Sequence, residues 1–130
     1  MAVWIIVPTK SVNGIKFGTE RKVVREKIAM DYTEFKKNKF SVNTSDNYGS
    51  FHIFFDEQDR FEAIELFKEE VVVIKDTKVF PCSVSDIGLM ADDFVEDAGN
   101  YISKNKSIGL TVANGMVEAA LFGYFDYYEE

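Results

Sequence analysis

Two segments of this 130-residue chain follow the same order of predicted elements, and this repetition limits the folds that the chain can adopt. Residues 14–67 contain a short apolar lead-in, a helix and antiparallel strands, and residues 79–125 repeat that order. The two segments also end alike, with EAIELF at 62–67 and EAALF at 118–122. The repetition predicts an α+β fold, with a single antiparallel curved sheet of about seven to eight strands and two main helices on one face.

Hydrophobic spacing and turn residues place the individual elements. A helix is predicted from about residue 18 to Ala29, with Thr19 as its cap, because apolar residues then recur on one face. A second helix is predicted from Ser83 or Ser85 to the Gly99-Asn100 pair. Asn114-Gly115 predicts a type I′ hairpin. Strands are predicted at Val3–Val7, Phe35–Val42, Phe51–Phe55, Phe61–Phe67, Val71–Ile74, Ile108–Val112 and Val117–Phe125.

The whole chain is interpreted as one domain, residues 1–130, with repeat unit one at about 14–74 and repeat unit two at about 79–125. A hydrophobic content of 46% and an aromatic content of 15% exclude a disordered chain. No apolar run reaches the roughly 18 residues that a membrane span needs, and the first residues lack the features of a secretory signal. The single Cys82 cannot form an internal disulfide. These features favour the cytoplasm.

The net charge of −7 is unevenly distributed along the chain. Residues 1–39 hold nine Lys/Arg and four Asp/Glu, a charge of +5, whereas residues 40–130 hold six and eighteen, a charge of −12. An acidic surface of this kind repels nucleic acid and anionic membranes and attracts a basic protein. Solubility alone is an alternative explanation for the charge.

A family resemblance rests on the run from Gly14 to Thr19, on Val23-Val24, and on the later Phe54-Phe55-Asp56 and Arg60-Phe61. This pattern resembles the repeat unit of the β-lactamase-inhibitor-protein-like fold. It is also similar to small bacterial immunity proteins of polymorphic toxin systems, in which a Gly-x-x-Phe-Gly-Met lead-in precedes the helix; here Thr19 replaces the Met. The resemblance implies tandem helix-plus-hairpin repeats, a concave face that binds another protein, and no catalysis.

Residues that could carry chemistry are few. His52 is the only histidine, and no His or Cys stands at metal-ligand spacing from it, so we expect a packed strand residue and no metal or cofactor. A Cys82/His52 nucleophile pair is conceivable, but a buried thiol is the commoner state of a free cysteine. The acidic run from Asp56 to Asp59 lacks the glycine and glutamate of an EF-hand loop. The basic stretch 36–40 fits a charged edge strand better than a phosphate site.

The most suggestive surface is the sheet face opposite the helices. If Phe51, Ile53, Phe55, Ile64 and Leu66 point to the core, the residues between them point away. Aromatic side chains on such a face form an apolar patch, and patches of this kind mark interfaces. Burial by the chain's own tail or by a homodimer is an alternative. The predicted partner-binding residues are His52, Phe54, Phe61, Glu65, Phe67, Tyr127 and Tyr128.

These observations favour a non-catalytic protein-binding module, namely a cytoplasmic bacterial immunity protein that inhibits a cognate toxin by occlusion. The expected partner is a protein with a basic surface, and neither nucleic acid nor membrane. Two alternatives remain open at this point: a small enzyme or ligand-binding domain with a pocket near His52, and a homo-oligomeric structural protein.

Overall fold

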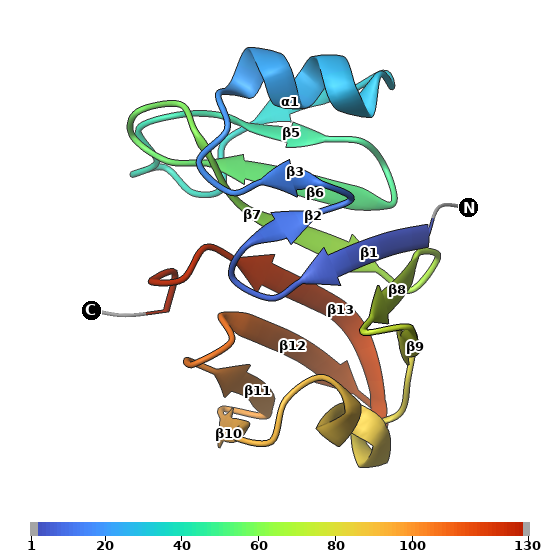
Figure 1. Cartoon of the computed structure of the whole chain (residues 1–130). Helices are drawn as coiled ribbons and strands as arrows, with labels where there is room; N and C mark the ends of the chain where they lie inside the picture. Colours follow the sequence, from blue (N-terminus) through green and yellow to red (C-terminus); the bar gives the residue numbers. More distant parts are fainter. Residues whose placement is uncertain (1–2, 129–130) are drawn as a thin grey trace.

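The computed structural model describes residues 3–128 and consists mainly of strands in two sheets (Figure 1). The strands of the small sheet are β1 (Val3–Val7), β2 (Ser11–Val12), β3 (Ile15–Lys16), β8 (Val71–Ile74) and β9 (Thr77–Phe80). The strands of the large sheet are β4 (Thr33–Phe35), β5 (Ser45–Asn47), β6 (Phe51–Phe55), β7 (Phe61–Phe67), β10 (Val95–Asp97), β11 (Asn100–Ser103), β12 (Ile108–Ala113) and β13 (Met116–Gly123). The helical segments are the α-helix α1 (Arg21–Ile28) and the 3₁₀-helix η1 (Val84–Leu89).

The prediction of a single antiparallel sheet with two main helices is wrong. The strand order is β3-β2-β1-β8-β9 in a five-stranded sheet and β10-β11-β12-β13-β7-β6-β5-β4 in an eight-stranded sheet. The chain passes from the large sheet to the small sheet between β7 and β8. β8 pairs in parallel with β1 in the register Val3↔Val71 and Ile5↔Val73. A parallel pair needs a long crossover connection, and the segment between the two strands supplies it.

The second predicted helix is also wrong. Only the short η1 forms there, with Gly88 inside it, and the chain then extends into the edge strand β10. Ala98 and Gly99 have φ values of 53° and 87°, so they form the two-residue turn of a β10–β11 hairpin and do not end a helix. The Ser103 hydroxyl donates a hydrogen bond to Asp93 Oδ1 at 2.6 Å, which holds the segment before β10 against this hairpin.

The first predicted helix is confirmed as α1, although its cap differs from the prediction. Glu20 occupies the N-cap position, while the Thr19 hydroxyl donates to the Lys16 carbonyl at 2.6 Å. Ala29 ends the helix in the left-handed conformation, with φ of 54°. The basic strand predicted at Phe35–Val42 is wrong except for Phe35, which is the last residue of β4; residues 36–44 lie outside the sheet.

The order of the large sheet is symmetrical about the β7–β13 pair, with β6, β5 and β4 on one side and β12, β11 and β10 on the other. β3 and β9, at the two edges of the small sheet, precede α1 and η1 respectively. The two halves of the chain therefore contribute corresponding strands to both sheets. No helix among residues 3–128 is long and apolar enough to cross a membrane.

The core lies between the two sheets, and Figure 1 shows β1, β2 and β3 passing across the large sheet with α1 near its β5 end. Trp4 of β1 packs on Phe51 of β6 with ring centroids 4.7 Å apart, and Val24 of α1 is fully buried in the same core. The predicted inward residues Phe51, Ile53, Phe55, Ile64 and Leu66 all belong to this core, which confirms their orientation. The opposite face of the large sheet is covered in part by other segments of the chain and otherwise contacts solvent.

Candidate functional site

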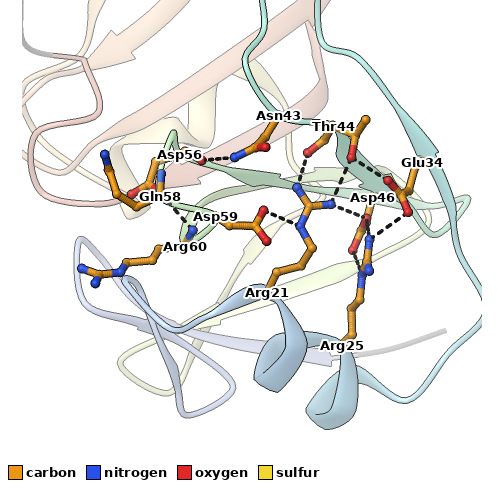
Figure 2. A network of polar contacts seen from close by, with 10 residues as sticks. All are labelled: Arg21, Arg25, Glu34, Asn43, Thr44, Asp46, Asp56, Gln58, Asp59 and Arg60. Carbon is orange, nitrogen blue, oxygen red and sulfur yellow. Dashed lines mark hydrogen bonds and ion pairs between the residues drawn. The ribbon is translucent and has the colours of Figure 1, made fainter.

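The densest polar cluster joins α1 to β5 and has a structural role (Figure 2). Asp46 of β5 is fully buried, and its two carboxylate oxygens accept hydrogen bonds from Arg25 at 2.8 and 2.7 Å. Arg21 Nη1 lies 3.3 Å from Asp46 Oδ1 and Arg21 Nε lies 2.7 Å from Asp59 Oδ1. The hydrogen bonds from Arg25 to Asp46 also raise the pKa of Arg25, which favours its charged form.

The remaining contacts of this cluster are internal as well. Arg21 Nη2 donates to the Thr44 carbonyl at 2.6 Å, and the Thr44 hydroxyl donates to Glu34 at 2.7 Å. The Arg21 and Arg25 guanidinium carbons also lie 4.1 and 4.2 Å from the ring centroids of Phe55 and Tyr32. Figure 2 shows the Arg21 and Arg25 guanidinium groups pointing toward the carboxylates of Glu34, Asp46 and Asp59. The cluster therefore fixes the edge of the large sheet, and the candidate site lies on the sheet itself.

The face of the large sheet that points away from the core is the candidate site, which we name the acidic face. Strand registers place its residues in rows, and one row runs through Val95, Ile102, Gly109, Leu121 and Glu65 to His52. The acidic face comprises His52, Phe54, Ala63, Glu65, Phe67, Val95, Ile102, Gly109, Thr111, Ala119, Leu121 and Gly123.

Three shallow hollows, two on this face and one beside it at the C-terminal segment, carry an excess of negative charge. The central hollow, of about 570 Å³, includes the carboxylates of Glu65, Glu69 and Glu118 beside one lysine, Lys68. A second hollow lies at the β10–β11 end and a third lies beside the C-terminal segment. Their charged residues are Asp93, Glu96, Asp97 and Lys104 in the second, and Asp56, Glu62, Asp126 and Lys37 in the third. With nine carboxylates and three lysines, the hollows favour a positively charged ligand.

Three of the predicted partner-binding residues lie together in the central hollow. His52 pairs with Glu65 across β6 and β7, and the His52 ring packs on Phe67 with centroids 5.0 Å apart in an edge-on arrangement. Burial lowers the pKa of His52 and raises the pKa of Glu65. Burial therefore favours the neutral form of His52, and Glu65 is a partly desolvated carboxylate.

Phe61 points the opposite way from the prediction. Phe61 is 1% exposed and packs in the core against Phe17 at 4.7 Å between ring centroids, so its predicted outward orientation is wrong. The cause is a β-bulge: Phe54 pairs with Ala63 but Phe55 pairs with Phe61, which leaves Glu62 as an extra residue and reverses the direction of Phe61.

Phe54 does lie on the acidic face, yet the chain itself covers it. It is only 4% exposed. The Lys37 ammonium lies 4.7 Å from its ring centroid, and the Phe35 ring packs edge-on against it at 6.4 Å. The segment that follows β4 therefore removes Phe54 from solvent, and a partner that binds this face cannot contact it directly.

The C-terminal segment crosses part of the acidic face, and we name residues 124–128 the strap. An added Cβ on Gly109 would lie 1.8 Å from the Tyr128 hydroxyl oxygen, and one on Gly123 would lie 2.7 Å from the Tyr127 side chain. The two glycines thus make room for the two tyrosines. Lys37 Nζ donates to the Tyr127 hydroxyl at 3.0 Å, and burial raises the pKa of both tyrosines. Residues 129 and 130, the acidic end of the predicted tail, lie outside the described residues.

The strap matches the alternative that the sequence left open, in which the chain's own tail covers part of this face. A glycine inside a strand is a signal of close approach by another group, and Gly109 and Gly123 both stand inside predicted strands. That signal indicates that something contacts the strand, but it does not identify the tyrosines as the contacting groups.

The Cys82/His52 pair does not assemble. Cys82 packs against the core, whereas His52 lies on the acidic face on the other side of the large sheet. Burial and the nearby Asp86 raise the pKa of the Cys82 thiol, which makes it a poor nucleophile. Within residues 3–128, no group of three or more His, Cys, Asp and Glu side chains is arranged to hold a metal ion.

Comparisons with protein-family models, with curated proteins and with solved structures find no match to this chain, so the resemblance drawn from its residues stays a prediction.

Proposed function

We propose that this chain is a non-catalytic protein-binding module, a bacterial immunity protein that acts in the cytoplasm and blocks a cognate toxin by occlusion. The observation that carries the proposal is the acidic face together with its three hollows, which hold nine carboxylates and three lysines beside aromatic and aliphatic side chains. A toxin domain that acts on nucleic acid has the complementary chemistry, because it uses basic residues to bind its own substrate.

The charge of the acidic face supports rapid association with such a domain. Complementary charge steers diffusional encounter and raises the association rate, and this effect weakens as salt screens the charges. The free thiol of Cys82 is compatible with a reducing compartment.

The central hollow supports slow dissociation. Phe67 and His52 provide aromatic surface, and Glu65 lies between His52 and Leu121 in one row of the sheet. Because Glu65 is partly desolvated, a lysine or arginine of the partner placed there gains a charge-assisted contact at little further desolvation cost. Such a contact, enclosed by apolar side chains, is typical of a binding hot spot.

The test is co-expression with the toxin domain encoded by a neighbouring gene, followed by growth rescue and co-purification. We expect the wild-type chain to rescue growth, and we expect Glu65→Lys and Phe67→Ala each to lose rescue and co-purification. Glu26→Lys is the matched control, because it makes the same charge change at an exposed position of α1 that lines none of the three hollows. Rescue that is unaffected by both changes on the acidic face would contradict the proposal.

A further inference from the structure

The outer face of the small sheet is a continuous aliphatic surface. Val3, Ile5 and Val7 of β1 are 54%, 59% and 47% exposed, and Val71 and Val73 of β8 are partly exposed beside them. The parallel register pairs Val3 with Val71 and Ile5 with Val73, so the five side chains adjoin on one face. We name these five residues the aliphatic face.

The sequence of these strands is typical of strands that are covered on both sides. β1 reads VWIIV and β8 reads VVVI, with no polar residue in either strand. Parallel strands of this composition normally have a packed layer on each face. The inner layer is the core, which contains Trp4 and Val72, but no described element of this chain covers the outer face.

The charges on the aliphatic face and on the acidic face indicate which of the two can contact a second copy of the chain. The aliphatic face has no charged residue in its interior, so two copies can meet there without burying like charges. Lys16 and Lys78 lie at its two edges, where their ammonium groups stay in water and repel only weakly. The acidic face, by contrast, would bring carboxylates together if it met a second copy.

The size of the aliphatic face fits the centre of a dimer interface. Val3, Ile5 and Val7 are each about half exposed, and Val71 and Val73 add partly exposed side chains beside them. A specific interface buries about 800 Å² on each partner, with an apolar centre inside a polar rim. Ser11, Lys16 and Lys78 lie around the aliphatic side chains and provide such a rim. A membrane is a less suitable occupant, because these strands contribute no aromatic side chain to this face and aromatic residues are enriched in membrane interfaces.

We propose that two copies of this chain associate through their aliphatic faces, with the two small sheets stacked about 10 Å apart. The contact is self-complementary, because each copy contributes the same five residues. The small sheet and the acidic face lie on opposite sides of the core, so the dimer leaves both acidic faces open. This inference does not depend on the proposed function.

The test is sedimentation velocity of the purified full chain from micromolar to near-millimolar concentration. We expect a reversible dimer, and we expect Ile5→Lys to weaken it at least 100-fold, since the change places a charge at the centre of the contact. Val95→Lys is the matched control, because Val95 is also an exposed strand valine, 66% exposed, at the far edge of the large sheet. This control leaves the dimer unchanged.

Three results would overturn the proposal. The first is a wild-type chain that stays monomeric at every concentration. The second is a dimer that Ile5→Lys leaves intact, or that Phe67→Ala disrupts, because the interface then lies elsewhere. The third is a monomeric chain that binds phosphatidylserine vesicles and loses this binding on Ile5→Lys, which identifies a membrane as the occupant. Circular dichroism of Ile5→Lys confirms that the variant is folded.

Discussion

Replacing Asp46 with Asn removes one charge from the centre of the network that joins α1 to β5. The carboxylate is 0% exposed, and the Arg21 and Arg25 side chains around it are 9% and 23% exposed. An asparagine amide has one acceptor oxygen, and its NH₂ group faces guanidinium donors. Removing one partner of a buried ion pair costs about 3–5 kcal/mol. We expect the lower part of this range, about 3–4 kcal/mol, because Arg25 retains some contact with water.

Thermal unfolding followed by circular dichroism measures this cost. For a chain of this length each kcal/mol lowers Tm by roughly 4 °C, so we expect Asp46→Asn to lower Tm by about 12–16 °C. Asp59→Asn is the matched control, because Asp59 contacts the same Arg21 at 2.7 Å but its side chain is 52% exposed. An exposed pair contributes at most about 1 kcal/mol, which corresponds to no more than about 4 °C. Equal Tm shifts for the two variants would refute the reasoning that burial determines the strength of this network.

Three further predictions concern the acidic face and the thiol. Because burial raises the pKa of Glu65 above its usual 4.5, the free protein is more stable when Glu65 is protonated. Glu65→Gln therefore stabilises the free protein at pH 7 in urea unfolding, and it weakens binding of a basic partner; unchanged stability would contradict the desolvation argument. Gly109→Ala displaces Tyr128 from its position at a cost below about 1 kcal/mol, since only the far end of the side chain is in the way. Spectrophotometric titration then shows one tyrosine pKa moving back toward the usual value of 10, and an unchanged titration curve would show that Tyr128 stays in place. Cys82 reacts with iodoacetamide at pH 7 more slowly than a free thiol does, because its pKa is raised; a faster reaction would indicate an activated cysteine.

Local patterns predicted the central strands well. Alternation in β6 and in most of β7 correctly separated Phe51 and Ile53 from His52, and Asn114-Gly115 forms the expected tight turn with φ values of 54° and 77°. The split into two sheets could not be predicted in the same way, because Val71–Ile74 is apolar on both sides and its pattern does not specify a partner strand. The second helix was predicted from apolar spacing, with Gly99-Asn100 as its end. The positive φ values of Ala98 and Gly99 show instead that these two residues form the turn of a hairpin.

The candidate site was predicted in part, for a similar reason. His52, Glu65 and Phe67 follow strand alternation and lie together as expected. Phe61 does not, because a bulge inserts one residue and alternation alone cannot locate a bulge. The cover over Phe54 comes from Lys37, a contact between distant parts of the chain. Contacts of this kind depend on tertiary structure, so they leave no local signature in the sequence.

The parallel pairing of β1 with β8 also constrains how the chain folds. Trp4, the only tryptophan, donates a hydrogen bond to Glu70 Oε1 at 2.6 Å across a separation of 66 residues. During synthesis β1 is made first, but it cannot pair with β8 until the intervening residues have been added. Contacts that close so long a segment form slowly and tend to form late. The emission of Trp4 is therefore a natural reporter of the closing step, and it distinguishes a chain whose large sheet alone has assembled from one that has completed folding.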